Sequence, residues 1–87
     1  MMRIKQGYML REIGGEPVVV PDEDELDMMI RLNDTGAALW KALEQETDLE
    51  ALTAMLIAQY GIDENRARSA AEGFVQKLQQ NNLLETV

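Results

Sequence analysis

The side chains that could do chemistry in this chain of 87 residues are carboxylates, hydroxyls, lysines and arginines. The chain has no histidine and no cysteine, so it lacks the commonest general base, a thiol nucleophile and the usual zinc and iron ligands. The sequence also contains no glycine-rich phosphate loop and no local pairing of catalytic groups. We therefore expect a protein that is not an enzyme and that holds neither a cofactor nor a metal.

The overall charge is strongly acidic, with 16 acidic against 8 basic residues and a formal net charge of −8. The basic residues are spread along the chain, which disfavours binding to the phosphate backbone of a nucleic acid. A basic or mixed-charge peptide suits this surface better.

The length predicts one domain over residues 1–87. No segment has the pattern of a signal peptide or reaches the roughly 20 apolar residues of a membrane span. We therefore expect a cytoplasmic protein without a membrane partner.

The first third of the chain has the pattern of three strands. Residues 7–13 and 16–20 flank a Gly-Gly pair, which suits a two-residue hairpin because glycine tolerates positive φ at both positions. An acidic connection then leads to a short apolar run, which predicts a third strand over residues 28–32. A meander in sequence order leaves this third strand at an open edge, where a further strand can pair.

From Asn33 onward the apolar spacing becomes helical. Asn33 or Asp34 can cap the first helix, and Gly36 within it suggests the close approach of another backbone segment. We assign Trp40 and Phe74 to the core rather than to a binding surface, because both lie in helical stripes with aliphatic neighbours.

Two further helices follow. Thr47 and Glu50 form the Thr-x-x-Glu pattern of a capping box, which predicts the start of a second helix that stops at Gly61. Asp63 predicts the cap of a third helix over residues 64–80. Strands grouped before helices indicate an α+β fold, in which helices cover one face of a small antiparallel sheet.

The run Leu-Asn-Asp-Thr-Gly at residues 32–36, followed by Leu39 and Trp40, resembles the PqqD family of pyrroloquinoline quinone biosynthesis. Its fold recurs as the element that recognises precursor peptides of ribosomally made, post-translationally modified peptides. The resemblance covers nearly the whole chain and departs from the family pattern in the acidic connection, residues 21–27. It implies a winged-helix-like fold, with a three-stranded antiparallel sheet followed by three helices.

The same resemblance implies a non-catalytic, chaperone-like adaptor. Such a protein binds the leader of a precursor peptide as an added strand along its third strand, in a groove shared with the third helix. It then presents the leader to a modifying enzyme, often a radical SAM enzyme. The residues implied for the groove are Met28, Met29, Ile30, Arg31, Leu32, Arg68, Ala71 and Val75.

Two other functions fit parts of the pattern. A winged-helix module that binds DNA in transcription fits the order of the helices but not the charge, and salt-sensitive binding to duplex DNA would support it. A structural homodimer that closes the open edge on itself would show a mass that depends on concentration.

Overall fold

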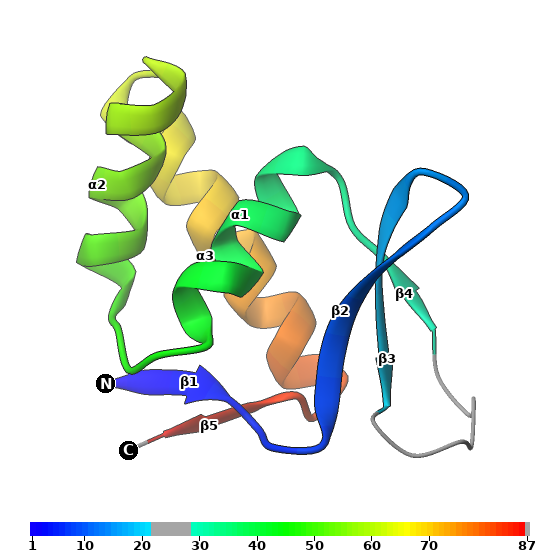
Figure 1. Ribbon diagram of the computed structural model, residues 1–87. Coiled ribbons are helices and arrows are strands. Elements are labelled where there is room, and N and C mark those ends of the chain that lie inside the picture. The colour runs from blue at the N-terminus through cyan, green and yellow to red at the C-terminus, as the bar shows by residue number, and fades with distance from the viewer. Residues whose placement is uncertain (22–28, 87) are drawn as a thin grey trace.

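The computed structural model describes residues 1–21 and 29–86. Within them, three helices lie on one side of a three-stranded antiparallel sheet, and a separate two-stranded ribbon joins the ends of the chain (Figure 1). This confirms the predicted α+β, winged-helix-like order of three strands before three helices, with one short strand added at each end. The predicted acidic connection beyond Pro21 and the groove residue Met28 lie outside the described residues.

The hairpin forms as the Gly-Gly pair predicts. β2 (Tyr8–Ile13) and β3 (Glu16–Pro21) pair antiparallel, and the two glycines between them have φ of 62° and 81°. Positive φ at both central positions gives a turn whose twist matches that of the strands. The register follows directly, with Ile13 opposite Glu16.

The third strand of the sheet is shorter than predicted. β4 (Ile30–Arg31) pairs with β3, so that β3 is central and β4 forms an edge. The backbone N–H of Leu32 extends the ladder by donating to the Pro17 carbonyl oxygen at 2.9 Å.

The first helix, α1 (Asp34–Leu43), begins with the predicted Asn33 cap, whose side-chain oxygen accepts a hydrogen bond from the Gly36 N–H at 2.7 Å. A Cβ added at Gly36 would lie 3.1 Å from that oxygen and 3.3 Å from both Leu32 and Phe74. The neighbours that require glycine here are therefore side chains and not the backbone segment that the sequence suggested.

A pair of alanine substitutions separates helix propensity from packing. Gly73→Ala is expected to raise the free energy of unfolding by about 0.5–1 kcal/mol, because its Cβ would meet no atom within 4 Å. Gly36→Ala gains the same propensity but overlaps three atoms, so we expect stability to fall by up to about 2 kcal/mol. Urea denaturation measures both, and equal stabilisation by the two variants would contradict the packing argument.

The second helix, α2 (Leu49–Tyr60), corrects one predicted cap. Its N-cap is Asp48, which accepts from the Ala51 N–H at 2.8 Å, and not Thr47. Thr47 pairs instead with Met2 through backbone hydrogen bonds of 2.8 and 2.9 Å, so its N–H is not available to a capping box.

The other predicted helix signals are confirmed. Gly61 ends α2 in the left-handed region, with φ of 65°. Asp63 caps α3 (Glu64–Gln80) by accepting from the Arg66 N–H at 2.8 Å.

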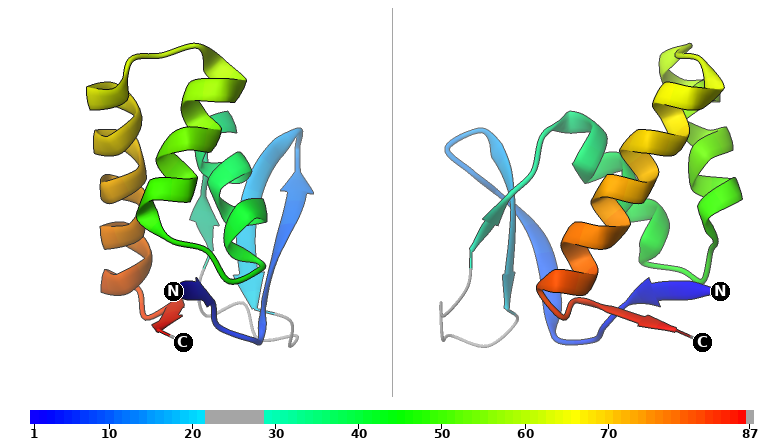
Figure 2. Two further views of the ribbon diagram at one scale, coloured as in Figure 1. Left: turned by 90° about the vertical axis from the view of Figure 1, so that its left-hand side faces the viewer. Right: turned by 180° about the vertical axis from the view of Figure 1, so that it is seen from behind.

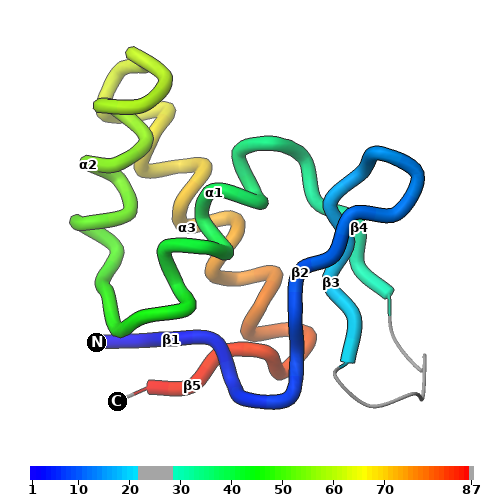
Figure 3. Tube along the Cα trace, viewed as in Figure 1, coloured from blue at the N-terminus to red at the C-terminus, as the bar shows by residue number. Residues whose placement is uncertain are grey.

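The two ends of the chain pair with each other, which the sequence did not indicate. β1 (Met2–Ile4) and β5 (Leu84–Thr86) form an antiparallel ribbon that brings the ends side by side (Figure 3). The Arg3 Nε lies 2.6 Å from the Glu85 carboxylate, whose hydrogen bond and charge raise the pKa of Arg3. Because β5 pairs with β1, the C-terminal strand does not occupy the edge of β4.

The core lies between the sheet and the helices. The central strand contributes Val19, which has no accessible surface, and Trp40 from α1 is 1% exposed. Phe74 is also buried, which confirms that both aromatic residues belong to the core. The other fully buried large side chains are Leu39, Leu43, Leu52, Leu56, Leu78 and Leu83.

Candidate functional site

A surface depression of about 400 Å³ lies between the edge strand β4 and the helix α3. The view from behind shows β4 beside the C-terminal half of α3 (Figure 2). We call this depression the β4–α3 groove. Its lining consists of Arg31, Leu32, Asn33, Gly36, Leu39, Ser69, Ala70, Gly73, Phe74 and Lys77.

Part of the α3 wall of the groove is made of small side chains. With about 3.6 residues per turn, Ser69, Ala70 and Gly73 fall on one margin of the helix, next to the buried Phe74. Open space surrounds Gly73, since an added Cβ would have no neighbour within 4 Å. The groove therefore has room for an apolar side chain from a ligand.

The opposite wall offers backbone groups that pair with no other strand among the described residues. Residues of an antiparallel edge strand alternate between bonding to their neighbour and pointing away from it. Because Leu32 donates to Pro17, the backbone N–H and C=O of Arg31 point away from β3. An added strand could pair with them.

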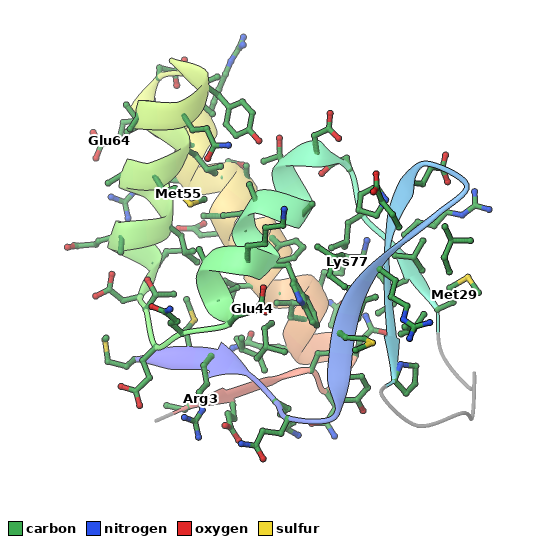
Figure 4. All side chains as sticks on the ribbon, viewed as in Figure 1. Arg3, Met29, Glu44, Met55, Glu64 and Lys77 are labelled. Atoms are coloured by element: carbon green, nitrogen blue, oxygen red, sulfur yellow. The ribbon has the colours of Figure 1, made fainter. Side chains whose placement is uncertain are left out.

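Two cations mark one end of the groove. The Lys77 Nζ lies 3.5 Å from the Arg31 carbonyl oxygen, so this side chain spans from α3 to β4 (Figure 4). Arg31 lies 3.7 Å from the Glu16 carboxylate, but both side chains are more than half exposed, so this ion pair is weak. These cations favour an acidic or mixed-charge ligand at the groove, which differs from the basic or mixed-charge peptide expected from the net charge of the whole chain.

The structure brings only part of the predicted groove together. Arg31 and Leu32 line it, whereas Met29 and Ile30 lie further along the same edge. Ala71 has no accessible surface, so it supports the core and cannot touch a ligand in this conformation. Arg68 and Val75 lie on the other margin of α3, across the buried stripe from Gly73.

Sequence reasoning missed the α3 residues that do line the groove. The helical spacing predicts a buried stripe that includes Val75, and the structure buries all of its members except Val75, which is half-buried; the others are Ala67, Ala71, Phe74 and Leu78. A stripe has two margins, and the sequence does not say which one faces the sheet. The cluster of small residues at 69, 70 and 73 was an available signal, since it leaves a hollow on one margin only.

The described residues indicate no metal site and no membrane span. Among them, no three acidic side chains come together in a way that could hold a metal ion. None of the helices within residues 1–21 and 29–86 is both long enough and apolar enough to cross a bilayer.

Comparisons with known proteins agree with this fold. Residues 16–84 match the model of a protein family described as coenzyme PQQ synthesis protein D (PqqD). The fold is similar to that of TbiB1 in complex with the TbiA(beta) leader peptide, with a TM-score of 0.78, 21% identity and coverage of 98% of this chain and 96% of that chain. It is also similar to lasso peptide synthetase B1 complexed with the leader peptide, with a TM-score of 0.77, 16% identity and 98% coverage of both chains. No curated protein sequence matches the chain.

Proposed function

Because this chain belongs to the PqqD family, we propose that it is a non-catalytic adaptor that captures the leader of a ribosomally made precursor peptide. The leader adds to β4 as a further strand and lies against α3. The adaptor then presents the peptide to a modifying enzyme, such as a radical SAM enzyme.

The observation that carries this proposal is an open sheet edge beside a hollow. Arg31 directs its backbone groups away from β3, and Gly73 leaves space on the facing helix. The same fold occurs in two proteins whose structures are leader-peptide complexes. A DNA-binding role has no comparable support, since a formal charge of −8 opposes contact with phosphates.

The energetics explain why the hollow matters. Each backbone hydrogen bond to the leader contributes a net gain of about 0.5–1.5 kcal/mol. Ordering the flexible peptide costs about 2–5 kcal/mol in total, which offsets most of the gain from several such bonds. Micromolar binding corresponds to about −8 kcal/mol. Burial of one or two apolar side chains, at roughly 1.5–3 kcal/mol each, must supply the difference.

The groove also limits the chemistry of the leader. Its hollow suits one bulky apolar side chain, held between Gly36 and Gly73 against the ring of Phe74. An acidic side chain nearby would lie within reach of Arg31 and Lys77. We therefore expect a leader in which an apolar residue lies close to an acidic one.

An NMR titration tests the site. The titrant is the leader of a short precursor encoded beside the gene for this chain. We expect shifts in the amide signals of Arg31, Ala70, Gly73 and Lys77, because these residues line the groove. The amide of Met29 should shift as well, because Met29 lies next to β4 on the edge where the leader adds. Amides of Arg68 and Val75, on the other margin of α3, should move least.

A scrambled peptide of the same composition is the control for this titration. It keeps the charge but changes the spacing between the apolar and acidic residues. Equal shifts with the scrambled peptide, or leader shifts confined to the far margin of α3, would contradict the proposed site.

A further inference from the structure

A second and larger depression, of about 750 Å³, lies at the opposite edge of the same sheet. It is bordered by β2, by Gly15 and Pro17 beside the turn of the hairpin, and by α1 and α2, and we call it the β2–α1 groove. It shares no lining residue with the β4–α3 groove. The helix α1 separates the two, because Gly36 and Leu39 face one groove and Ala38 and Lys41 face the other.

The edge of β2 is open over most of the strand. In the hairpin, Ile13 bonds to Glu16 across the turn, so Arg11 and Met9 also direct their backbone groups to β3. The alternate residues Tyr8, Leu10 and Glu12 direct theirs away from the sheet. No backbone hydrogen bond to these three residues from outside the hairpin occurs within the described part of the chain.

The floor of the β2–α1 groove is apolar and made of small side chains. Ala37, Ala38 and Ala42 are half-buried there, and Met55 of α2 closes one side. In a strand added to β2, alternate side chains would point toward this floor. Small residues leave room for those side chains.

The charges at this groove balance. Arg11 and Lys41 are cationic and Glu12 and Asp34 are anionic, and no ion pair involves any of them among the described residues. A near-neutral, apolar strand fits such a surface. A second copy of this chain fits less well, because each copy carries a formal charge of −8 and the copies repel each other.

We propose that the β2–α1 groove accepts an extended, near-neutral segment of the peptide-modifying enzyme as an added strand. This inference rests on the proposed function, in which the leader occupies the β4 edge. Leader and enzyme would then flank the three strands of one sheet, about 19 Å apart at about 4.8 Å per strand spacing. About six extended residues span that distance, so peptide that emerges from the leader could reach the enzyme.

Amide hydrogen exchange of the full chain tests this assignment. The probes are the purified peptide-modifying enzyme encoded beside the same gene and, separately, the leader. We expect the enzyme to slow exchange at least fivefold at the amides of Tyr8, Leu10 and Glu12. The leader should slow exchange at Met29 and Arg31 instead.

Substitutions at the groove give a second readout. Ala38→Trp fills the floor and is expected to weaken enzyme binding at least tenfold while leader affinity stays within twofold. Ala54→Trp, on the exposed face of α2 outside both grooves, is the matched control and should change neither affinity. Gln59→Trp, at an exposed position of the same groove, replaces Ala38→Trp if that variant does not fold.

Several results would overturn the inference. They are protection by the enzyme that excludes the β2 edge, unchanged enzyme affinity in the groove variants, or no binding of the enzyme at all. Protection of the β2 edge that rises with the concentration of this chain alone would assign the groove to a second copy. Failure of the leader to protect the β4 edge would instead refute the proposed function, and enzyme protection at β2 would remain a separate result.

Discussion

Gly73→Met is expected to weaken leader binding by about 10- to 150-fold while the protein stays folded. The methionine side chain would fill the hollow of the β4–α3 groove, where an added Cβ meets no atom within 4 Å. The leader then loses the burial of one apolar side chain, at roughly 1.5–3 kcal/mol. Isothermal titration calorimetry with the leader measures this loss.

The folded state should tolerate this change or gain from it. Methionine is a better helix former than glycine by up to about 1 kcal/mol, and the new side chain projects into open space. Urea denaturation should therefore give an unchanged or higher midpoint. A variant that binds less tightly but unfolds no earlier separates a ligand contact from a structural defect.

A matched control comes from the same helix. Gln79→Met introduces the same side chain at an exposed position of α3 that does not line the groove. Leader affinity of this control should match that of the original chain. Unchanged affinity of Gly73→Met itself, within twofold, would rule out the hollow as the anchoring site.

Trp40→Ala is expected to lower the free energy of unfolding by about 3–5 kcal/mol. Trp40 is 1% exposed and packs in the core between α1 and the sheet, so its removal leaves a large cavity. A domain of this size has about 5–15 kcal/mol of stability in total, so the variant is close to unfolding. Far-ultraviolet circular dichroism in urea measures the change, because the substitution removes the only tryptophan and with it the usual fluorescence signal.

Ile57→Ala is the surface control for this experiment. Ile57 lies on α2 with 37% of its surface exposed, and its truncation should lower stability by no more than about 1.5 kcal/mol, because its side chain is only partly covered. A loss for Trp40→Ala that is no larger than this control would mean that Trp40 is not a core residue. For Trp40→Ala, leader binding should decrease in proportion to the fraction of protein that is folded. For Gly73→Met, leader binding should decrease although the protein stays folded.

The two edges of one small sheet are proposed to bind different partners, the leader at β4 and the peptide-modifying enzyme at β2. The central strand β3 is buried and paired on both sides, whereas β2 and β4 each have one side open among the described residues. Each open edge lies beside a depression, and α1 separates the depressions. Two partners could therefore bind at once without competing for the same surface.

Local signals in the sequence were sufficient to predict the hairpin and the three helices. The Gly-Gly pair defines the hairpin, Asn33 and Asp63 cap their helices, and Gly61 ends α2, because each of these effects depends on residues only a few positions apart. Composition alone likewise excludes histidine and cysteine chemistry. Most of the buried stripe of α3 was also predicted, since periodicity follows from helix geometry alone.

Contacts between residues distant in the sequence determine three features that local signals did not predict: the cap of α2, the ribbon of β1 and β5, and the margin of α3 that lines the groove. Met2 forms two backbone hydrogen bonds with Thr47, and Asp48 instead of Thr47 is the N-cap of α2. The strand β1 pairs with β5 from the other end of the chain. The packing of α3 against the sheet selects the margin that carries Gly73 and turns Val75 away from the groove. The apolar spacing along a helix locates its buried stripe but does not distinguish the two margins of that stripe. Only the positions of the neighbouring elements in space show which margin lines the groove.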